Sequence, residues 1–559
     1  MFGRRRARER HPSSGSSADL ARLWEDEPSD AAGQAPPDAA ATDAMRAPPP
    51  GPPPTPPLAT PPAAGAGPIT GLDSPPPASP RRPPSGRGRR QLAGVAVVVA
   101  ALAAAVVVDR AIGSGESTAV ASPTPTGPTM AESAATSSAW YCPALAASVT
   151  SRAAGSLIIA NTAGAAVSVV VTAVPSSGRP VVTDRVMAPY TRAAVRLQDI
   201  APGNYTAATV VFEGSGGAVE EEVHGSLGDS IAPCASGSSN HWYFATGSTD
   251  DNATEYISLY NPYPAPAIAD LSFETDQGPF NPDAFQAIVV PGGGFNVVDI
   301  GTRVRSRTKV STTVDVRSGR LVATELQELT NLSRSGPRGL ALTLGAPDLG
   351  SSWYFADGRV NSGVTERFDV FNPGDAEAAV SAAPILDQGS ADPFDLTVPP
   401  QATVSLEVDQ QARIPPGIGE AWVLTSTNGV PVAVERVIVS RPPTPTRGVA
   451  DATGVPAPAR RWVFAAGTAA QGADERVVVF DPGGAPARVS VVASGSGQAV
   501  TLRSLVVGAG ARAAVDIGEL DRGATVVIEL TSNVPVVAER EQVPAGGAGL
   551  SNATGIAGQ

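Results

Sequence analysis

At 559 residues the chain is long enough for three or four domains, because single hydrophobic cores seldom grow past a few hundred residues. Residues 1–90 carry 12 Arg and 9 acidic residues, a net charge of +3. The whole chain has a net charge of −13, so the rest of the chain has a net charge of −16. An acidic main body repels phosphate backbones, which excludes nucleic acid as a partner of the C-terminal region.

An apolar run divides the chain into two parts. Residues 92–108 (LAGVAVVVAALAAAVVV) carry no charge and would span roughly 26 Å as a helix. Five arginines shortly before the run place the N-terminus in the cytoplasm by the positive-inside rule. We therefore expect a signal anchor in the cell membrane, with the bulk of the chain extracellular. A cleaved signal peptide and a buried core helix are the alternatives.

The segments on either side of this run lack the composition of a packed domain. Residues 1–91 contain Pro-rich runs such as APPPGPPPTPPLATPP, which predict a disordered cytoplasmic tail. Within the tail, the segment ADLARLWEDEP could fold on a cytoplasmic partner, or it could remain solvated. Residues 109–138 are rich in Ser, Thr and Pro and predict a linker.

An aromatic phrase recurs through the remainder, as HWYFATG, SSWYFADG and RRWVFAAG, and a shorter form, WYCP, precedes them. Other residues keep the same register. Asn261-Pro262, Asn372-Pro373 and Asp481-Pro482 lie nineteen residues after the last three tryptophans. Paired small positions precede each later tryptophan and also the C-terminus: Gly228 and Cys234, Gly339 and Gly345, Gly448 and Gly454, Gly549 and Gly555. Four tandem units follow, at residues 139–237, 238–348, 349–457 and 458–559.

The third unit contains seven short β-branched runs separated by NPG, PP, PPG and TNG turns. This spacing predicts an all-β fold of tandem immunoglobulin-like sandwiches. A single β-propeller is the competing architecture, although its blades usually need only about 40 to 50 residues.

Within each phrase, Trp and Phe lie two residues apart and share one face of a strand, which predicts that both point into the module core. An exposed aromatic platform for sugar stacking is the alternative. The expected core residues are Trp140, Trp242, Phe244, Trp353, Phe355, Trp462 and Phe464.

The first unit has Cys142 where the others have Phe, and Cys234 where the others have Gly. Both cysteines follow the apolar run, so a Cys142–Cys234 disulfide is expected. If the units superpose, each Phe should lie beside the matching Gly: Phe244 by Gly345, Phe355 by Gly454 and Phe464 by Gly555.

Recurring glutamates are the one repeated ionisable feature: Glu255, Glu366 and Glu475 early in each unit, and Glu325, Glu435 and Glu539 late in it. Carboxylate pairs could serve a glycosidase. Salt bridges to neighbouring arginines, or hydrogen bonds to the indole N–H groups, would explain the repetition structurally. The STDDNATE loop offers oxygen ligands for Ca²⁺, but its counterparts lack the acids. We expect no catalytic residues, no metal and no cofactor.

The WYFATGST, WYFADG and WVFAAGT phrases, each followed by Glu, by Asn-Pro or Asp-Pro, and by a late glutamate, resemble modules of uncharacterised actinobacterial secreted and membrane-anchored proteins of unknown function. This resemblance implies a cell-envelope setting. The first unit lacks the early Glu and the Asn-Pro step, so it could fold differently.

The sequence thus favours a non-catalytic, single-pass envelope protein that acts as a spacer or interaction scaffold for cell-wall glycan, envelope proteins or other membrane partners. A transmembrane coupler that relays extracellular binding to a cytoplasmic partner of the tail is the first alternative. A polysaccharide-active enzyme is the second.

Overall fold

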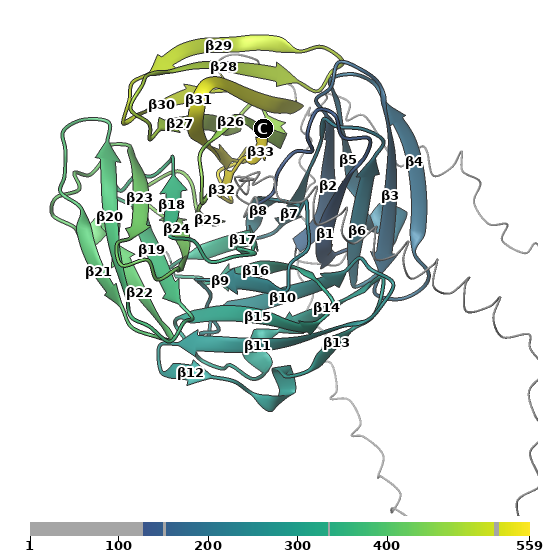
Figure 1. Cartoon of the computed structure of the whole chain (residues 1–559), viewed down its shortest axis with the longest axis horizontal. Coiled ribbons are helices and arrows are strands. Elements are labelled where there is room, and N and C mark those ends of the chain that lie inside the picture. Colours follow the sequence, from purple (N-terminus) through teal and green to yellow (C-terminus); the bar gives the residue numbers. More distant parts are fainter. Residues whose placement is uncertain (1–126, 149–152, 334–335, 519–524, 559) are drawn as a thin grey trace, which may run out of the picture. The chain divides into compact units, whose positions relative to one another are not determined.

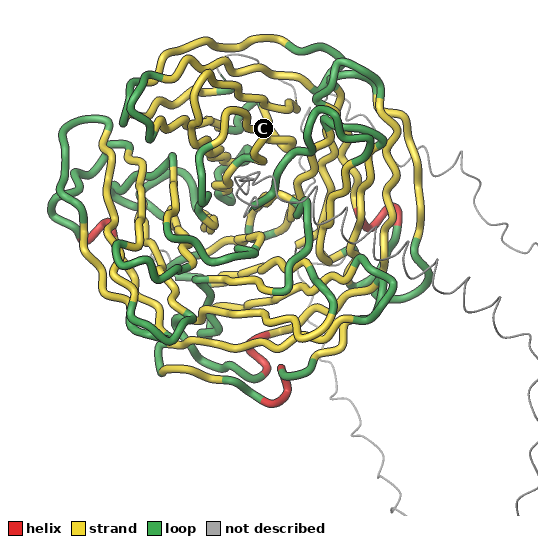
Figure 2. Tube along the Cα trace, in the orientation of Figure 1, coloured by secondary structure: helices red, strands yellow, loops and turns green. Residues whose placement is uncertain are grey.

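The computed structural model describes residues 127–148, 153–333, 336–518 and 525–558, which fall within one compact unit. Its regular secondary structure is almost entirely β-strand, and loops and turns join the strands (Figure 2). Four single turns of helix interrupt it: α3 (Leu197–Ile200), η2 (Asp283–Phe285), η3 (Ile300–Thr302) and η4 (Val408–Gln410). None of the described helices is long and apolar enough to cross a bilayer. The predicted tail (1–91) and anchor (92–108) lie outside the described residues.

The strands form four modules, and each module begins with a tryptophan-bearing strand. Numbered within a module, strands 1, 6, 3 and 4 make a first antiparallel sheet in that order, and strands 5, 2, 7 and 8 make a second. Seven of these strands correspond to the predicted runs. The eighth strand lies between the paired Gly or Cys positions.

The bounds of the strands are as follows. Module 1 holds β1 (Ser138–Ala146), β2 (Ala153–Asn161), β3 (Val167–Pro175), β4 (Val181–Met187), β5 (Thr191–Arg196), β6 (Tyr205–Phe212), β7 (Gly217–Gly225) and β8 (Gly228–Pro233). Module 2 holds β9 (His241–Phe244), β10 (Ala253–Asn261), β11 (Ala267–Thr275), β12 (Gly278–Phe280), β13 (Ile288–Val290), β14 (Gly294–Asp299), β15 (Val310–Ser318), β16 (Val322–Thr330) and β17 (Arg338–Leu344), with β12 and β13 together replacing strand 4.

Module 3 holds β18 (Ser352–Phe355), β19 (Val364–Asn372), β20 (Ala378–Leu386), β21 (Phe394–Val398), β22 (Ala402–Glu407), β23 (Glu420–Ser426), β24 (Ala433–Ser440) and β25 (Gly448–Thr453). Module 4 holds β26 (Ala459–Thr468), β27 (Asp474–Asp481), β28 (Ala487–Ser494), β29 (Val500–Val507), β30 (Ala511–Asp516), β31 (Thr525–Val543), β32 (Ser551–Thr554) and β33 (Ile556–Gly558). Here the long β31 supplies both strand 6 and strand 7, because it pairs first with β28 and then with β27.

This strand order shares its two central pairs, 2 with 5 and 3 with 6, with the immunoglobulin constant domain. The outer positions differ. Strand 1 lies beside strand 6 and strand 7 lies beside strand 2, so the first and seventh strands have exchanged places relative to the immunoglobulin order. Module 1 follows the same order as the others, so it does not fold differently.

The two sheets of each module enclose a core of alternating strand residues. In β3, for example, Val167, Val169, Val171 and Ala173 are buried and the residues between them are partly exposed, as the two-residue period of a strand requires. The four phrase tryptophans are each at most 2 % exposed, and Phe244, Phe355 and Phe464 are fully buried. Burial of each such ring contributes roughly 1.5 to 3 kcal/mol to folding.

The modules follow one another around a closed ring, with the eighth strand of each module near its middle (Figure 1). β8 contacts β17, β17 contacts β25, β25 contacts β32, and β32 returns to β8. The first glycine of each recurring pair lies where these strands cross. A Cβ on Gly339 would lie 2.6 Å from the Val449 nitrogen, and one on Gly448 would lie 2.4 Å from the Leu550 nitrogen. Only glycine permits so close an approach of two backbones.

The two ends of the folded part also meet. Thr129 forms a parallel bridge with Ala557 of β33, and the Met130 N–H donates to the Ala557 carbonyl at 2.7 Å. The chain therefore enters the ring from the linker beside its own C-terminal strand.

Candidate functional site at the junction of modules 1 and 2

The paired Phe and Gly positions lie together as the superposition argument expects. A Cβ on Gly345, Gly454 or Gly555 would lie 2.7, 2.6 or 2.9 Å from the Cζ of Phe244, Phe355 or Phe464. In module 1 the same two positions form the predicted disulfide, Cys142–Cys234, with the Cα atoms 4.9 Å apart. First and last strands are thus neighbours in every module.

The recurring glutamates are all buried, but they hold two different places. Glu255 and Glu366 each pack against the glycine that ends the phrase of their own module. A Cβ on Gly247 would lie 2.7 Å from Glu255 Oε2, and one on Gly358 would lie 2.6 Å from Glu366 Oε1. Burial raises the pKa of Glu255 to about 8 and the pKa of Glu475, the third of this set, to about 7.

The late glutamates Glu435 and Glu539 join one module to the module before it. Glu435 Oε2 accepts hydrogen bonds from the N–H groups of Ala245 and Thr246, both at 2.8 Å. Glu539 Oε2 accepts one from the Asp357 N–H, also at 2.8 Å. In both cases the donor lies between the Phe and the final Gly of the aromatic phrase of the preceding module. We call this contact the latch.

A third latch closes the ring from module 4 to module 1. Glu220 Oε2 accepts a hydrogen bond from the Ala466 N–H at 2.6 Å. Glu220 lies in β7, at the register of Glu435 and Glu539, and was missed in the sequence because the landmarks of module 1 were not recognised. The GAVEEEVHG segment ahead of Gly228 is the signal that could have found it.

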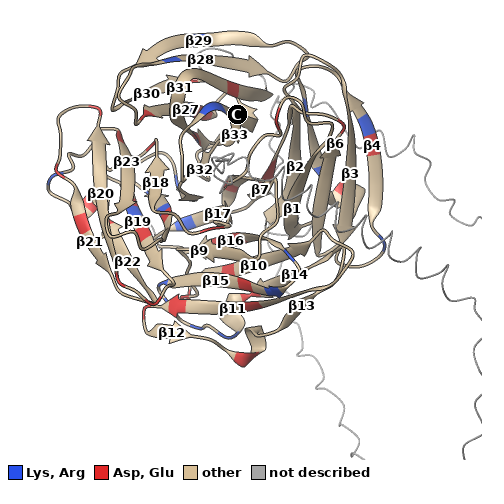
Figure 3. Ribbon diagram, viewed as in Figure 1, with Lys and Arg blue, Asp and Glu red and all other residues tan. Residues whose placement is uncertain are grey.

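Arginines reinforce two of the latches. Each arginine directly follows one latch glutamate in its strand and contacts the latch glutamate of the next module around the ring. Arg436 lies 3.0 Å from Glu539 and 3.9 Å from Glu366, and Arg540 lies 3.0 Å from Glu220. Both guanidinium groups are buried, at 5.2 Å from the ring centroid of Phe355 and 5.4 Å from that of Phe464. Removing one partner from a buried pair typically costs about 3 to 5 kcal/mol of stability. Figure 3 shows charged positions on strands near the middle of the ring.

The indole N–H groups of the last three phrase tryptophans do not bind the recurring glutamates. They donate instead to backbone carbonyls: Trp242 to Leu321 at 3.0 Å, Trp353 to Val432 and Trp462 to Val536, both at 2.8 Å. Each bond lies within one module, and the three carbonyls therefore mark equivalent positions at strand 7 of modules 2, 3 and 4.

Measured from these equivalent positions, the alignment of Glu325 with Glu435 and Glu539 is wrong by one residue. Glu325 pairs with Ile257 of β10, whereas Arg436 pairs with the corresponding Phe368 of β19. Glu325 therefore holds the arginine position, not the glutamate position. Thr324 stands where modules 3 and 4 have the latch glutamate.

Acidic residues thus replace the arginine in modules 1 and 2. Glu221 pairs with Leu157 at this register, and it is fully buried. No hydrogen-bond partner of the Glu221 or Glu325 carboxyl oxygens is found among the described residues. Burial raises the pKa of both groups well above the usual value, and Glu255, Glu435 and Asp451 raise that of Glu325 further.

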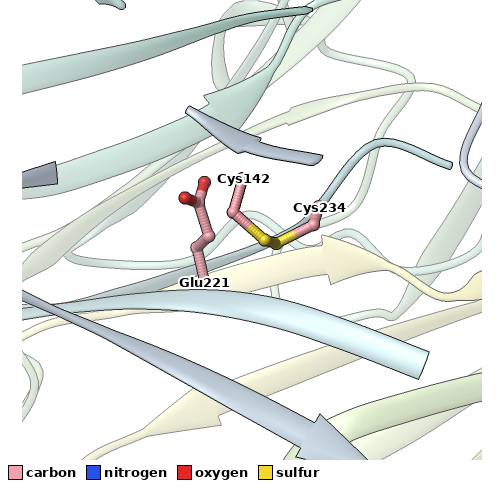
Figure 4. Close-up of side chains that lie close together, drawn as sticks. All are labelled: Cys142, Glu221 and Cys234. Carbon is pink, nitrogen blue, oxygen red and sulfur yellow. A yellow bond between two sulfur atoms is a disulfide. The ribbon is translucent and has the colours of Figure 1, made fainter. Parts of the chain in front are cut away.

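Glu221 lies beside the disulfide (Figure 4) because the arginine position faces the phrase phenylalanine, which is Cys142 in module 1. The Sγ atoms of Cys142 and Cys234 and a carboxylate oxygen of Glu221 lie within 4.8 Å of one another, a spacing that could suit a metal ion. The two sulfur atoms are bonded to each other, so in this state they cannot act as thiolate ligands. No other grouping of this kind occurs in the part of the chain that the structure describes.

The junction of modules 1 and 2 lacks the latch altogether. Pro143 has no N–H, and the Ala144 N–H donates to the Ser258 hydroxyl at 2.8 Å. Leu145 occupies the place of the phrase glycine and Gly155 that of the early glutamate: a Cβ on Gly155 would lie 2.4 Å from the Leu145 Cβ. The glycine and the large side chain have changed places.

A cavity of about 260 Å³ lies at this junction. Its walls come from both modules: Ala144, Leu145, Ala146, Ala153 and Tyr205 of module 1, and Thr254, Tyr256, Ser258, Val297, Thr324, Leu326, Glu328 and Leu342 of module 2. It combines hydroxyl groups, phenol rings, aliphatic walls and one carboxyl group, that of Glu328, which is the composition of a small-molecule site.

A family of unknown function (DUF5719) matches residues 216–410 and, in a second overlapping match, residues 338–558. The chain belongs to this family. The first DUF5719 match begins just ahead of β7, the seventh strand of module 1, and the second begins at β17, the eighth strand of module 2. Both matches therefore begin near the end of one module and continue into the next. The first six strands of module 1 lie outside both matches.

No curated protein matches the DUF5719 chain. Among solved structures, a tetra-tandem repeat in the extending region of a large adhesion protein is 13% identical over 75% of this chain and 99% of its own, with a TM-score of 0.09. A score so low carries no argument about fold or function.

Proposed function

We propose that this protein is a non-catalytic, single-pass protein of an actinobacterial cell envelope. Residues 92–108 anchor it, the N-terminus is cytoplasmic, and the immunoglobulin-like modules with their WYFA-G phrases are extracellular. The ring acts as an interaction scaffold for cell-wall or membrane partners. We propose that the four domains have the limits of the sequence repeats, at residues 139–237, 238–348, 349–457 and 458–559.

The observation that carries this proposal is closure of the ring. Glu220 of module 1 binds Ala466 and Arg540 of module 4, and Thr129 lies against Ala557. An extended spacer would separate its two ends, whereas a closed ring returns them to one place. Closure therefore favours the scaffold over the spacer.

The buried glutamates favour a role without catalysis. Each of the six that recur is at most 1 % exposed, so none can meet a polysaccharide unless a module opens. Exchange of Glu366 and Glu475 for Gln should leave any measured hydrolase activity of purified preparations unchanged. Loss of turnover with retained folding would instead support an enzyme.

A transmembrane coupler is the second candidate, and one observation favours it. The segment that leads out of the linker is hydrogen-bonded into the ring beside β33, through Met130 and Ala557. Movement of modules 4 and 1 could therefore reach the linker and the tail.

Crosslinking in intact cells, followed by identification of the captured species, tests the scaffold. Envelope proteins or glycan should dominate the capture, and cytoplasmic species alone would contradict it. A variant that lacks residues 1–80 separates the two candidates: the scaffold keeps its captured partners, and the coupler loses its function.

A further inference from the structure

The cavity between modules 1 and 2 lies where other junctions carry acidic and basic side chains. Ser258 pairs with Thr324 across β10 and β16. At the same register, Asp369 pairs with Glu435 across β19 and β24. Two hydroxyl groups therefore replace two carboxylates.

The neighbouring position changes in the same direction. Tyr256 of β10 stands at the register of Arg367 and Arg476. Arg367 ion-pairs with Asp369 at 2.9 Å, and Arg476 with Asp357 at 3.0 Å. Charged side chains thus fill the later junctions, whereas the first has phenol and alcohol groups around an open volume, with Glu328 as the one acidic residue of its wall.

Aromatic side chains gather at this junction in a chain that has only 5% of them. Five of the eight tyrosines lie in or beside it: Tyr141, Tyr205, Tyr256, Tyr260 and Tyr263. Tyr205 and Tyr256 line the cavity itself and are partly exposed. The Tyr260 hydroxyl bonds to Thr209 of module 1 at 2.7 Å and holds the two modules together.

We propose that this cavity binds one neutral sugar ring of a cell-wall glycan. A sugar presents an apolar face to an aromatic ring and hydroxyl groups to Ser and Thr side chains, which are the two kinds of surface present here. The volume of about 260 Å³ lies below the roughly 300 to 1,000 Å³ of typical ligand sites, so it admits one ring. The choice of a wall glycan rests on the proposed envelope function; the preference for an uncharged, hydroxyl-rich ligand does not.

An extended Pro-rich peptide is another ligand of tyrosine-lined surfaces, but it requires a long groove. The Ser258 and Thr324 hydroxyls, both buried beside the cavity, favour the sugar.

The test uses the purified full-length chain in a detergent without sugar head groups. Saturation-transfer NMR measures binding of methyl glycosides of glucose, galactose, mannose and arabinose, and titration calorimetry measures the affinity. Two variants place bulk or charge in the cavity. Thr254→Trp fills it, and Thr324→Glu installs the residue that the latch position has in the other modules.

The matched control is Thr365→Trp, which makes the same exchange at the same register of module 3, away from the cavity. At least one glycoside should bind, and Thr254→Trp and Thr324→Glu should each weaken it by about tenfold or more. Thr365→Trp should leave the affinity unchanged. Thr324→Glu should lower the melting temperature, because Pro143 has no N–H and the Ala144 N–H already donates to Ser258, so Thr254→Trp decides the outcome if Thr324→Glu does not fold.

Absence of binding by every glycoside would overturn the proposal. Binding that both cavity variants retain, or displacement of the glycoside by a Pro-rich peptide but not by other sugars, would overturn it as well. Crosslinking in intact cells separates this outcome from failure of the proposed function. If the natural chain still captures envelope partners while no sugar binds, the scaffold stands and the sugar site alone falls.

Discussion

Glu325→Gln should make the protein less sensitive to alkaline pH. Glu325 of β16 faces Glu255 of β10, Glu435 of β24 and Asp451 of β25, at the register where modules 3 and 4 have a buried arginine. Because the folded state raises the pKa of Glu325, it binds this proton more tightly than the unfolded state does. The resulting stability is fully present below about pH 4.5 and is lost as the pH rises through the folded pKa.

Glu255 gives the scale of this effect. Its pKa rises from 4.5 to about 8 on burial, which corresponds to roughly 5 kcal/mol of stability lost between those two pH values. Gln has the shape of the protonated acid and cannot ionise. The variant should therefore match the natural chain at pH 5 and exceed its unfolding free energy at pH 8 by about 2 to 5 kcal/mol.

Urea unfolding followed by tryptophan fluorescence at pH 5, 6, 7 and 8 measures this difference. Arg436→Gln, at the same register of module 3, is the matched control. It removes the cation beside Glu366 and Glu539, so it should destabilise the protein by about 3 to 5 kcal/mol at neutral pH. Parallel pH profiles for Glu325→Gln and the natural chain would refute the reasoning.

Three further predictions concern the modules themselves. Replacing Cys142 and Cys234 by Ala opens a loop of 92 residues and should lower the unfolding free energy by about 4 kcal/mol. Adding a reductant to this variant should lower its unfolding free energy no further. Gly345→Ala places a Cβ 2.7 Å from a buried ring and should cost about 1 to 3 kcal/mol, whereas Gly237→Ala, with open space around it, should be neutral in the same thermal melts. Asn372→Ala removes the amide that donates to Ala376 and Pro399 at the turn after β19 and should cost about 1 to 3 kcal/mol in urea unfolding; no change would contradict a structural role for the Asn-Pro step.

Much of the module could be read from the sequence because the relevant forces are local. Alternation of apolar residues and turn chemistry predicted the strands, and the replacement of Phe and Gly by two cysteines predicted the disulfide. The same pairing placed Phe244 beside Gly345, because a ring needs the space that a missing Cβ leaves.

Ring closure could not be predicted from the sequence. It depends on contacts between residues hundreds of positions apart, such as Glu220 and Arg540, and no local pattern encodes them. The shift of Glu325 into the arginine register is of the same kind. The register of strand 7 within each module is marked by the indole-to-carbonyl bond, which joins residues 79 positions apart, and a one-residue slip sends a side chain to the opposite face of a strand.

The coupling energy between Glu220 and Arg540 is the most direct test of the closed ring. These residues lie 320 positions apart, in the first and last modules, and they touch only if the ring closes. A double-mutant cycle with Glu220→Gln and Arg540→Met, measured by urea unfolding, should give a coupling of about 1 to 3 kcal/mol. Additive effects of the two substitutions would contradict closure and, with it, the scaffold built on it.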